Sequence, residues 1–214
     1  MLCVDSADRD AVGELLPTGV FEGVTTNPQI LACAGLGVDD IPQLCADLRS
    51  AGVRRLFVQT WGSGLEEMRH AAARLLDTDA DLVIKVPATR AGFQLCGELS
   101  RRGVPVLVTM VYHPVQTLVA AEAGAWGVAP YVGRMKDIGV SWQERIGQMR
   151  DILAHTKVRI LAASLRDREM VAECAAMGIK DLTFGVPLAR AVLTDAATEG
   201  ALEEFETILG HVGR

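Results

Sequence analysis

What this sequence lacks argues against several classes of protein. It has no stretch near the ~18 consecutive apolar residues that a membrane-spanning helix requires. It has no excess of basic residues either, because 21 lysines and arginines stand against 27 acidic residues and leave a net charge of −6. A nucleic-acid-binding surface usually needs a basic face. We therefore expect neither a membrane nor a nucleic acid among its partners.

Cysteines are few, and motifs that bind metals or nucleotides are missing. The five cysteines lie far apart, no two of them form a C-x-x-C pair, and no phosphate-loop or dinucleotide glycine motif occurs. This pattern is typical of a reducing compartment and argues against a zinc site. The chain reaches Asp5 too early for the basic and apolar regions of a signal peptide. We expect a cytoplasmic protein without a bound metal.

The sequence does contain a regular alternation of short apolar, β-branched runs with longer segments of helical periodicity. Eight runs end near Asp5, Thr25, Gln59, Lys85, Thr109, Tyr131, Ser164 and Thr183. The longer segments predict helices over residues 8–16, 39–50, 65–76, 89–102, 113–122, 141–155, 168–177 and 187–192. Eight such units without a break in composition predict an α/β fold, a (β/α)8 TIM barrel forming a single domain over residues 1–214. A doubly wound open sheet is the alternative, because periodicity does not distinguish open from closed sheets.

An additional helix is predicted near the C-terminal end of the sequence, over residues 198–209. Its apolar residues, Leu202, Phe205, Ile208 and Leu209, fall on one face. That face packs either on its own barrel or on a neighbouring subunit, and the sequence leaves both arrangements open.

Residues 82–87 place a lysine, Lys85, inside a run that otherwise reads as a buried strand. Burying an ammonium group is costly unless it is paired or loses its proton, and burial lowers the pKa of a lysine. Only the neutral amine attacks a carbonyl to form a Schiff base. Lys85 is therefore a candidate nucleophile. In the alternative, its stem lies on apolar surface while its amine reaches solvent.

Polar residues end every predicted strand, and in a TIM barrel these ends form the active-site face. Asp5 is expected to transfer a proton or to stabilise the iminium on Lys85. Gln59, Thr109 and Tyr131 are expected to hold a water that carries a proton to and from carbon, with the phenol as acid or base. Taken singly, Asp5 also reads as a turn residue, and Gln59 and Thr109 as ordinary hydrogen-bonding groups of a barrel interior.

Arg134, Ser164 and Arg166 form a second group on the late units. The loops after the last strands of TIM barrels often bind phosphate, and arginine binds phosphate oxygens in bidentate fashion. The group therefore predicts an anion site, for which phosphate, sulfonate and carboxylate are all suitable. For Arg166, a solvated loop residue is the alternative.

Several segments together resemble the transaldolase family, in particular its short members, which include fructose-6-phosphate aldolase. They are residues 23–28 (GVTTNP), 85–87 (KVP), 128–131 (VAPY) with Arg134, and 162–164 (AAS). The resemblance implies a (β/α)8 enzyme, free of metal and other cofactors, that makes or cleaves a ketose bond through a lysine Schiff base. It also implies a ring-like homo-oligomer, a pentamer or decamer, in which the C-terminal helix reaches a neighbour.

The same resemblance assigns roles to individual residues. It implies that Lys85 is the nucleophile and Asp5 its acid/base partner. It implies that Asn27, with Thr25 or Thr26, holds the hydroxyls of a dihydroxyacetone unit. It implies that Arg134, Ser164 and Arg166 bind the phosphate of a sugar phosphate substrate.

Two positions separate the branches of the family. Transaldolases are expected to carry glutamate and phenylalanine where this chain has Gln59 and Tyr131. Glutamine can orient a water but cannot exchange a proton with it, which leaves Tyr131 as the acid. We interpret the chain as an aldolase that interconverts fructose 6-phosphate with dihydroxyacetone and glyceraldehyde 3-phosphate. The alternatives are a transaldolase and a catalytically silent sugar-phosphate-binding barrel.

The sequence departs from the family pattern at three positions. Ser6 stands where threonine is usual, His113 where a small residue is usual, and Gly133 where the aldolase branch commonly has asparagine. His113 and Gly133 are expected to reshape the acceptor side of the site, which leaves the identity of the acceptor open. A relative that acts on a sulfonated sugar is a further possibility.

Overall fold

Eight parallel strands, β1 to β8 in chain order, close into a barrel. The computed structural model describes residues 1–212, with side chains as far as Leu209. The strands are β1 (Leu2–Asp5), β2 (Phe21–Thr25), β3 (Arg55–Gln59), β4 (Val83–Pro87), β5 (Val106–Val111), β6 (Gly127–Pro130), β7 (Arg159–Leu165) and β8 (Asp181–Phe184). The predicted TIM barrel is confirmed. The open-sheet alternative is wrong, because β8 pairs with β1 and leaves no sheet edge.

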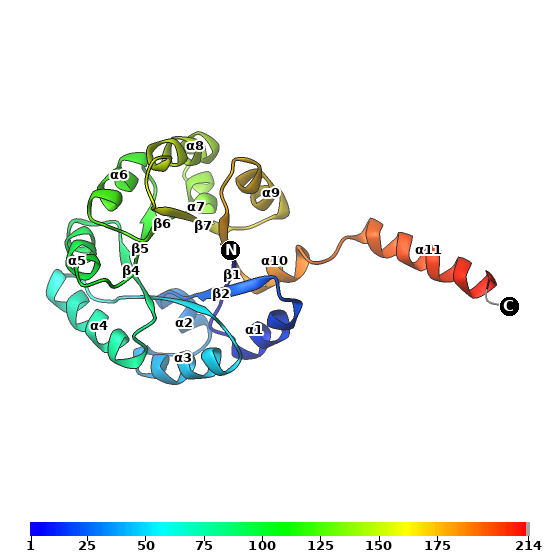
Figure 1. The fold of residues 1–214 in the computed structure, drawn as a ribbon, viewed down its shortest axis with the longest axis horizontal. Helices are drawn as coiled ribbons and strands as arrows, with labels where there is room; N and C mark the ends of the chain where they lie inside the picture. The colour runs from blue at the N-terminus through cyan, green and yellow to red at the C-terminus, as the bar shows by residue number, and fades with distance from the viewer. Residues whose placement is uncertain (213–214) are drawn as a thin grey trace.

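Helices surround the strand ring on its outer side (Figure 1). They are α1 (Arg9–Leu15), α2 (Pro28–Cys33), α3 (Ile41–Ser50), α4 (Leu65–Thr78), α5 (Arg90–Arg101), α6 (Pro114–Glu122), α7 (Val132–Asp137), α8 (Trp142–Leu153), α9 (Arg168–Ala176), α10 (Val186–Ala191) and α11 (Ala196–Val212), with short 3-10 turns η1 (Leu16–Thr18) and η2 (Val38–Asp40). Each segment predicted as helical contains a helix. The sequence pattern does not predict α2 and α7, which are each six residues long and directly follow a strand end without a clear apolar period of their own.

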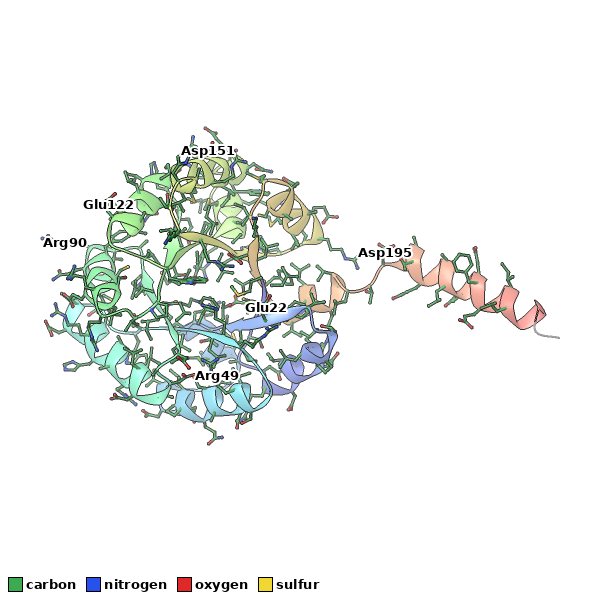
Figure 2. All side chains as sticks on the ribbon, viewed as in Figure 1. Glu22, Arg49, Arg90, Glu122, Asp151 and Asp195 are labelled. Carbon is green, nitrogen blue, oxygen red and sulfur yellow. The ribbon has the colours of Figure 1, made fainter. Side chains whose placement is uncertain are left out.

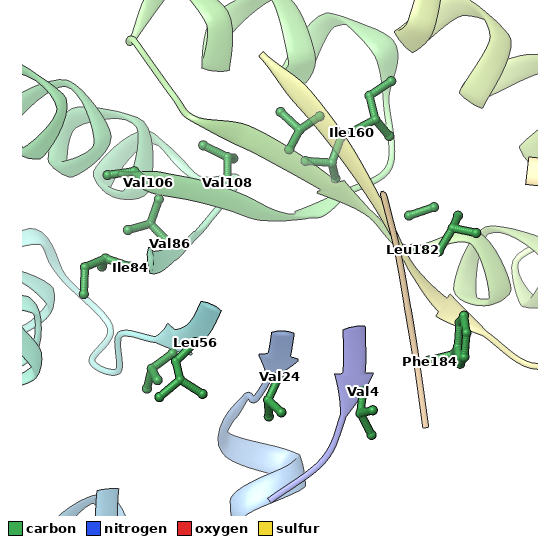
Figure 3. Close-up of a cluster of buried hydrophobic side chains, with 14 of the residues drawn as sticks. Val4, Val24, Leu56, Ile84, Val86, Val106, Val108, Ile160, Leu182 and Phe184 are labelled. Atoms are coloured by element: carbon green, nitrogen blue, oxygen red, sulfur yellow. The ribbon is translucent and has the colours of Figure 1, made fainter. Parts of the chain in front are cut away.

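Alternate residues of each strand face opposite sides of the barrel wall. Side chains on the outer side pack against the helices, and these include Val4, Val24, Leu56, Ile84 and Val86 (Figure 3). A separate buried cluster fills the interior, and it includes Cys3, Phe57, Val83, Leu107 and Leu161. Because Ile84 and Val86 face outward, Lys85 between them points into the barrel.

Aromatic and charged groups close the barrel at the amino-terminal ends of its strands. The rings of Trp126 and Phe57 lie 5.4 Å apart, and the guanidinium of Arg159 lies 5.2 Å from the Trp126 ring. Arg159 also donates two hydrogen bonds to Asp181, of 2.7 and 2.6 Å. The interior is therefore accessible from the carboxyl-terminal ends of the strands.

Helix α11 extends away from the barrel, and its side chains lie beyond the link at Asp195 (Figure 2). The predicted C-terminal helix is confirmed and is longer than expected, covering Ala196–Val212. Its apolar side chains are exposed, Leu202 at 58% and Phe205 at 62%, so they do not pack on their own barrel. Across residues 1–212, every helix is too short or too polar to traverse a lipid bilayer.

Candidate active site

A cavity with a volume of about 150 Å³ opens at the carboxyl-terminal ends of the strands. Most of the residues identified from the sequence line it, and these are Asp5, Thr25, Asn27, Lys85, Thr109, Tyr131, Arg134 and Ser164. Thr26, Gln59 and Arg166 are not among its lining residues. The barrel thus gathers into one cavity side chains that are up to 178 positions apart in the sequence (Asp5 and Thr183).

Lys85 lies on β4 and is only 4% exposed. Its Nζ donates a hydrogen bond of 2.6 Å to the backbone oxygen of Thr26. Burial lowers the pKa of Lys85 below its ordinary value of 10.5, and the nearby carboxylate of Asp5 partly opposes this shift. The solvated, snorkelling alternative for Lys85 is therefore wrong, since the amine is enclosed. Its environment favours the neutral, nucleophilic form.

Asp5 ends β1 beside the ends of β2 and β8. Its Oδ1 accepts a hydrogen bond of 2.5 Å from the hydroxyl of Thr25, which in turn lies 2.7 Å from the hydroxyl of Thr183. Burial raises the pKa of Asp5, while Lys85 and the Thr25 hydroxyl lower it. A carboxylate with a raised pKa is a stronger base, so Asp5 is suited to accept a proton inside the cavity.

Tyr131 follows β6, and its phenol lies beside the end of β5. Thr109 donates a hydrogen bond of 3.4 Å to the phenol oxygen, and the ring of Tyr112 packs edge-on against the Tyr131 ring with centroids 6.0 Å apart. Burial raises the pKa of Tyr131, and the Thr109 hydrogen bond partly opposes this. The phenol therefore keeps its proton at neutral pH and is available as an acid.

Gln59 ends β3, in register with Lys85 on β4. It is buried, and among the residues that the structure describes none donates a hydrogen bond to its Oε1. An unsatisfied buried carbonyl oxygen costs about 1–3 kcal/mol. Such an atom favours a water or a substrate hydroxyl as its donor, which is the role predicted for Gln59.

The segment after β2 contributes Thr26 and Asn27. The Thr26 hydroxyl is buried and points to the backbone oxygen of Phe57 at 3.5 Å, so Thr26 contacts Lys85 through its carbonyl group alone. The Asn27 side chain caps α2, and its Oδ1 accepts a hydrogen bond of 3.0 Å from the amide of Ile30. The amide nitrogen of Asn27 is then the group left to bind a ligand in the cavity.

Arg134 and Ser164 lie together at the rim of the cavity. The guanidinium of Arg134, on α7, stacks 5.3 Å from the Tyr131 ring centroid and donates a hydrogen bond of 3.1 Å to Gln29. Ser164 has a φ of 59°, a left-handed conformation that costs a non-glycine residue about 1–3 kcal/mol. The local register shift of β7 against β8 accompanies this conformation. Both side chains present hydrogen-bond donors to the cavity.

Arg166 is paired elsewhere. Its guanidinium donates to both carboxylate oxygens of Asp137, at 2.6 Å to Oδ1 and also to Oδ2. Its Nε lies 2.8 Å from where a Cβ on Gly133 would stand, and the Ser164 carbonyl oxygen lies 2.2 Å from that point. No side chain fits at position 133 in this arrangement. The glycine that departs from the aldolase branch therefore lets α7 approach β7 closely.

The sequence analysis missed several lining residues. Leu107, Ala129, Leu161 and Ala163 line the cavity below the polar ring. Each lies two residues from another inward-facing position, so the alternation along the strands was a usable signal. Gln29 also lines the cavity, but it lies on α2, which the sequence pattern does not predict.

The sequence of this chain is similar to those of proteins in a known family. Residues 2–212 match the family described as Transaldolase/Fructose-6-phosphate aldolase. A protein of Cereibacter sphaeroides named "Probable transaldolase" is 32% identical over 99% of this chain and 96% of its own length. Proteins with the same name from Coprothermobacter proteolyticus and Nitrosopumilus maritimus are 31% and 32% identical, each over 94% of this chain and over 93% and 91% of their own lengths.

A solved structure is also similar. The thiamine phosphate pyrophosphorylase from Pyrococcus furiosus superposes with a TM-score of 0.61, covering 86% of this chain and 84% of that protein, at 14% sequence identity. At so low an identity, the similarity shows the fold alone.

Proposed function

Because the chain belongs to the transaldolase/fructose-6-phosphate aldolase family, we propose that it is a class I aldolase. It cleaves fructose 6-phosphate to dihydroxyacetone and glyceraldehyde 3-phosphate and catalyses the reverse condensation. The observation that carries this proposal is the buried amine of Lys85, held by the Thr26 carbonyl in a cavity that also contains Asp5. Arg134 and Ser164 at the rim are suited to the phosphate.

In the cleavage direction, Lys85 Nζ bonds to the ketone carbon C2, and loss of one water leaves an iminium. The C3–C4 bond then breaks, its electron pair moves to the iminium to form an enamine, and the proton of the C4 hydroxyl passes to Asp5. Glyceraldehyde 3-phosphate leaves. The enamine carbon C3 then takes a proton, and water hydrolyses the new iminium to release dihydroxyacetone and the free amine.

The remaining polar groups serve the proton transfer at C3. Tyr131 supplies this proton through a water that Gln59 and Thr109 orient, and its raised pKa keeps the phenol protonated until then. Asn27 and Thr25 bind the hydroxyls of the three-carbon unit. Asp5 then returns the proton that it took from the C4 hydroxyl, through the same water, to the Tyr131 phenolate, which restores the starting state of both groups.

The proposal is tested by trapping the Schiff base. The protein is mixed with dihydroxyacetone or fructose 6-phosphate and reduced with borohydride, and the adduct is located by intact mass and peptide mapping. A three-carbon adduct on Lys85 is the expected result. Absence of an adduct on the folded protein would favour the barrel that only binds sugar phosphates.

A transaldolase is the second candidate, and the names of the relatives favour it. In that reaction the three-carbon unit stays on Lys85 until a second aldose phosphate accepts it. Gln59 and Tyr131 favour the aldolase, since the phenol supplies the proton that releases the unit. Release of dihydroxyacetone from fructose 6-phosphate alone would identify the aldolase, whereas a requirement for erythrose 4-phosphate would identify the transferase.

On the alkaline side, the pH dependence of the reaction follows from the shifted pKa values of Lys85 and Tyr131. Burial lowers the pKa of Lys85 below its ordinary 10.5, so kcat/KM is expected to rise with pH and to level off below that value. The pKa of Tyr131 is raised above its ordinary 10.0 by burial, so the acid stays protonated through neutral and mildly alkaline pH. Initial rates from about pH 5 to 11 measure the profile. A rise that continues to the ordinary lysine pKa would contradict the assignment of Lys85.

We also propose that the chain assembles as a ring-like homo-oligomer through α11. The exposed face containing Leu202 and Phe205 is the surface that a neighbouring subunit would cover. Replacing both residues by aspartate is expected to reduce the mass measured by light scattering to that of a smaller assembly or one chain. The matched control replaces Glu203, on the opposite side of α11, by glutamine. An unchanged mass in the aspartate variant would overturn this proposal.

We place the reaction in the cytoplasm. All five cysteines are free, and Cys3, Cys45, Cys96 and Cys174 are buried. Free thiols are typical of a reducing compartment. The phosphorylated substrate proposed here is consistent with that location.

A further inference from the structure

Gln29 joins the two helices at the rim of the cavity. It is the second residue of α2, and Asn27 and Pro28 fix the start of that helix. Its Oε1 accepts a hydrogen bond of 3.1 Å from Nη2 of Arg134 on α7, and both side chains line the cavity. This contact links residues 105 positions apart in the sequence. It therefore sets where the guanidinium of Arg134 lies relative to the cavity.

The chemistry of the amide decides what Gln29 presents to a ligand. A glutamine has one oxygen acceptor and two N–H donors, and arginine has donors only. The oxygen is used by Arg134, so the Nε2 donors remain, and no group of residues 1–209 accepts a hydrogen bond from them. The rim therefore offers the Gln29 amide, the Arg134 guanidinium and the Ser164 hydroxyl as donors. Several donors around one positive charge favour a tetrahedral oxyanion.

The second arginine of the region does not share this task. Arg166 is held by Asp137 in a bidentate ion pair and does not line the cavity. The carboxylate of Asp137 also neutralises the positive charge of Arg166. The positive charge available to a ligand at this rim is that of Arg134. The neutral amide of Gln29 beside it adds a hydrogen-bond donor, which strengthens the binding of an anion without changing the charge of the site.

We propose that Gln29 is a substrate-binding and specificity-determining residue, which orients Arg134 and donates its own amide to the phosphate of the substrate. This inference rests on the proposed function and extends it to the choice between phosphorylated and uncharged substrates. Such a rim favours a phosphorylated substrate over an uncharged one, because the phosphate pairs with the Arg134 guanidinium and accepts a hydrogen bond from the amide.

Direct binding of inorganic phosphate, measured by titration calorimetry, tests the inference without turnover. Gln29→Ala is expected to raise the Kd for phosphate about 10-fold, the effect of losing one hydrogen bond to a charged group. Gln29→Glu is expected to raise it about 100-fold or more, because the new carboxylate pairs with Arg134 and repels the anion. The matched control is Gln148→Ala, an exposed glutamine of α8 with a side-chain hydrogen bond of its own.

A second readout separates phosphate recognition from general damage to the site. Borohydride trapping of dihydroxyacetone on Lys85 uses an uncharged substrate, and its yield is expected to be unchanged in Gln29→Ala. Phosphate binding equal to that of the wild type, or no phosphate binding by the wild type, would overturn the inference, as would a parallel loss of trapping. If phosphate binding weakens as expected while the wild type forms no lysine adduct, the inference stands and the proposed function fails.

Discussion

Replacing Lys85 by methionine is expected to lower the rate of fructose 6-phosphate cleavage on the order of 10⁴-fold or more, because no other group replaces a covalent nucleophile. Methionine fills a similar volume without a charge. The measurement is the release of glyceraldehyde 3-phosphate by purified protein, together with the loss of the borohydride-trapped adduct. The control is Lys157→Met, which removes an exposed lysine. Turnover within about 10-fold of the wild type would rule out the Schiff base.

The same substitution is expected to increase stability, which distinguishes loss of chemistry from loss of folding. Because the pKa of Lys85 is lower in the folded protein than in the unfolded chain, the unfolded chain binds more protons and is favoured as the pH falls. Lys85→Met removes this penalty. Its gain in stability is expected to be present at neutral pH and to shrink as the pH rises toward 10.5. Thermal unfolding of both proteins at several pH values measures the difference.

Replacing Tyr131 by phenylalanine is expected to lower kcat for cleavage about 10²–10³-fold, the range for removing a general acid. Only the phenol oxygen is lost, so the packing of the ring against Tyr112 and Arg134 is retained. Borohydride trapping of dihydroxyacetone on Lys85 is expected to persist, because formation of the iminium does not require the step assigned to Tyr131. The two readouts together separate proton transfer from substrate binding.

Tyr112→Phe is the matched control for this experiment. Tyr112 is half-buried, and its ring packs against that of Tyr131, but it does not line the cavity. Its hydroxyl is therefore expected to be dispensable, with kcat unchanged. A loss below about 10-fold in Tyr131→Phe would show that another group delivers the proton. An equal loss in both variants would indicate a packing effect.

The sequence by itself determined the strands, their alternation with helices and the polar character of the strand ends. Each strand appeared as a local apolar run, and the residue that ends a run marks the carboxyl-terminal face in any parallel barrel. Lys85 was recognisable in the same way, since a lysine inside an otherwise apolar run is rarely buried without a functional reason. These properties depend on neighbours along the chain, and so they can be read without a structure.

The tertiary structure alone decided which partner each polar side chain has. The decisive contacts join residues from different βα units. They are the pairing of β8 with β1, the hydrogen bond from Lys85 to the Thr26 carbonyl, the ion pair of Arg166 with Asp137 and the hydrogen bond between Arg134 and Gln29. The tertiary structure also decided that the apolar face of α11 is exposed, since the amphipathic pattern of this helix is equally consistent with packing on its own barrel. Such choices depend on distances between segments remote in sequence. Local composition and periodicity contain no information about those distances.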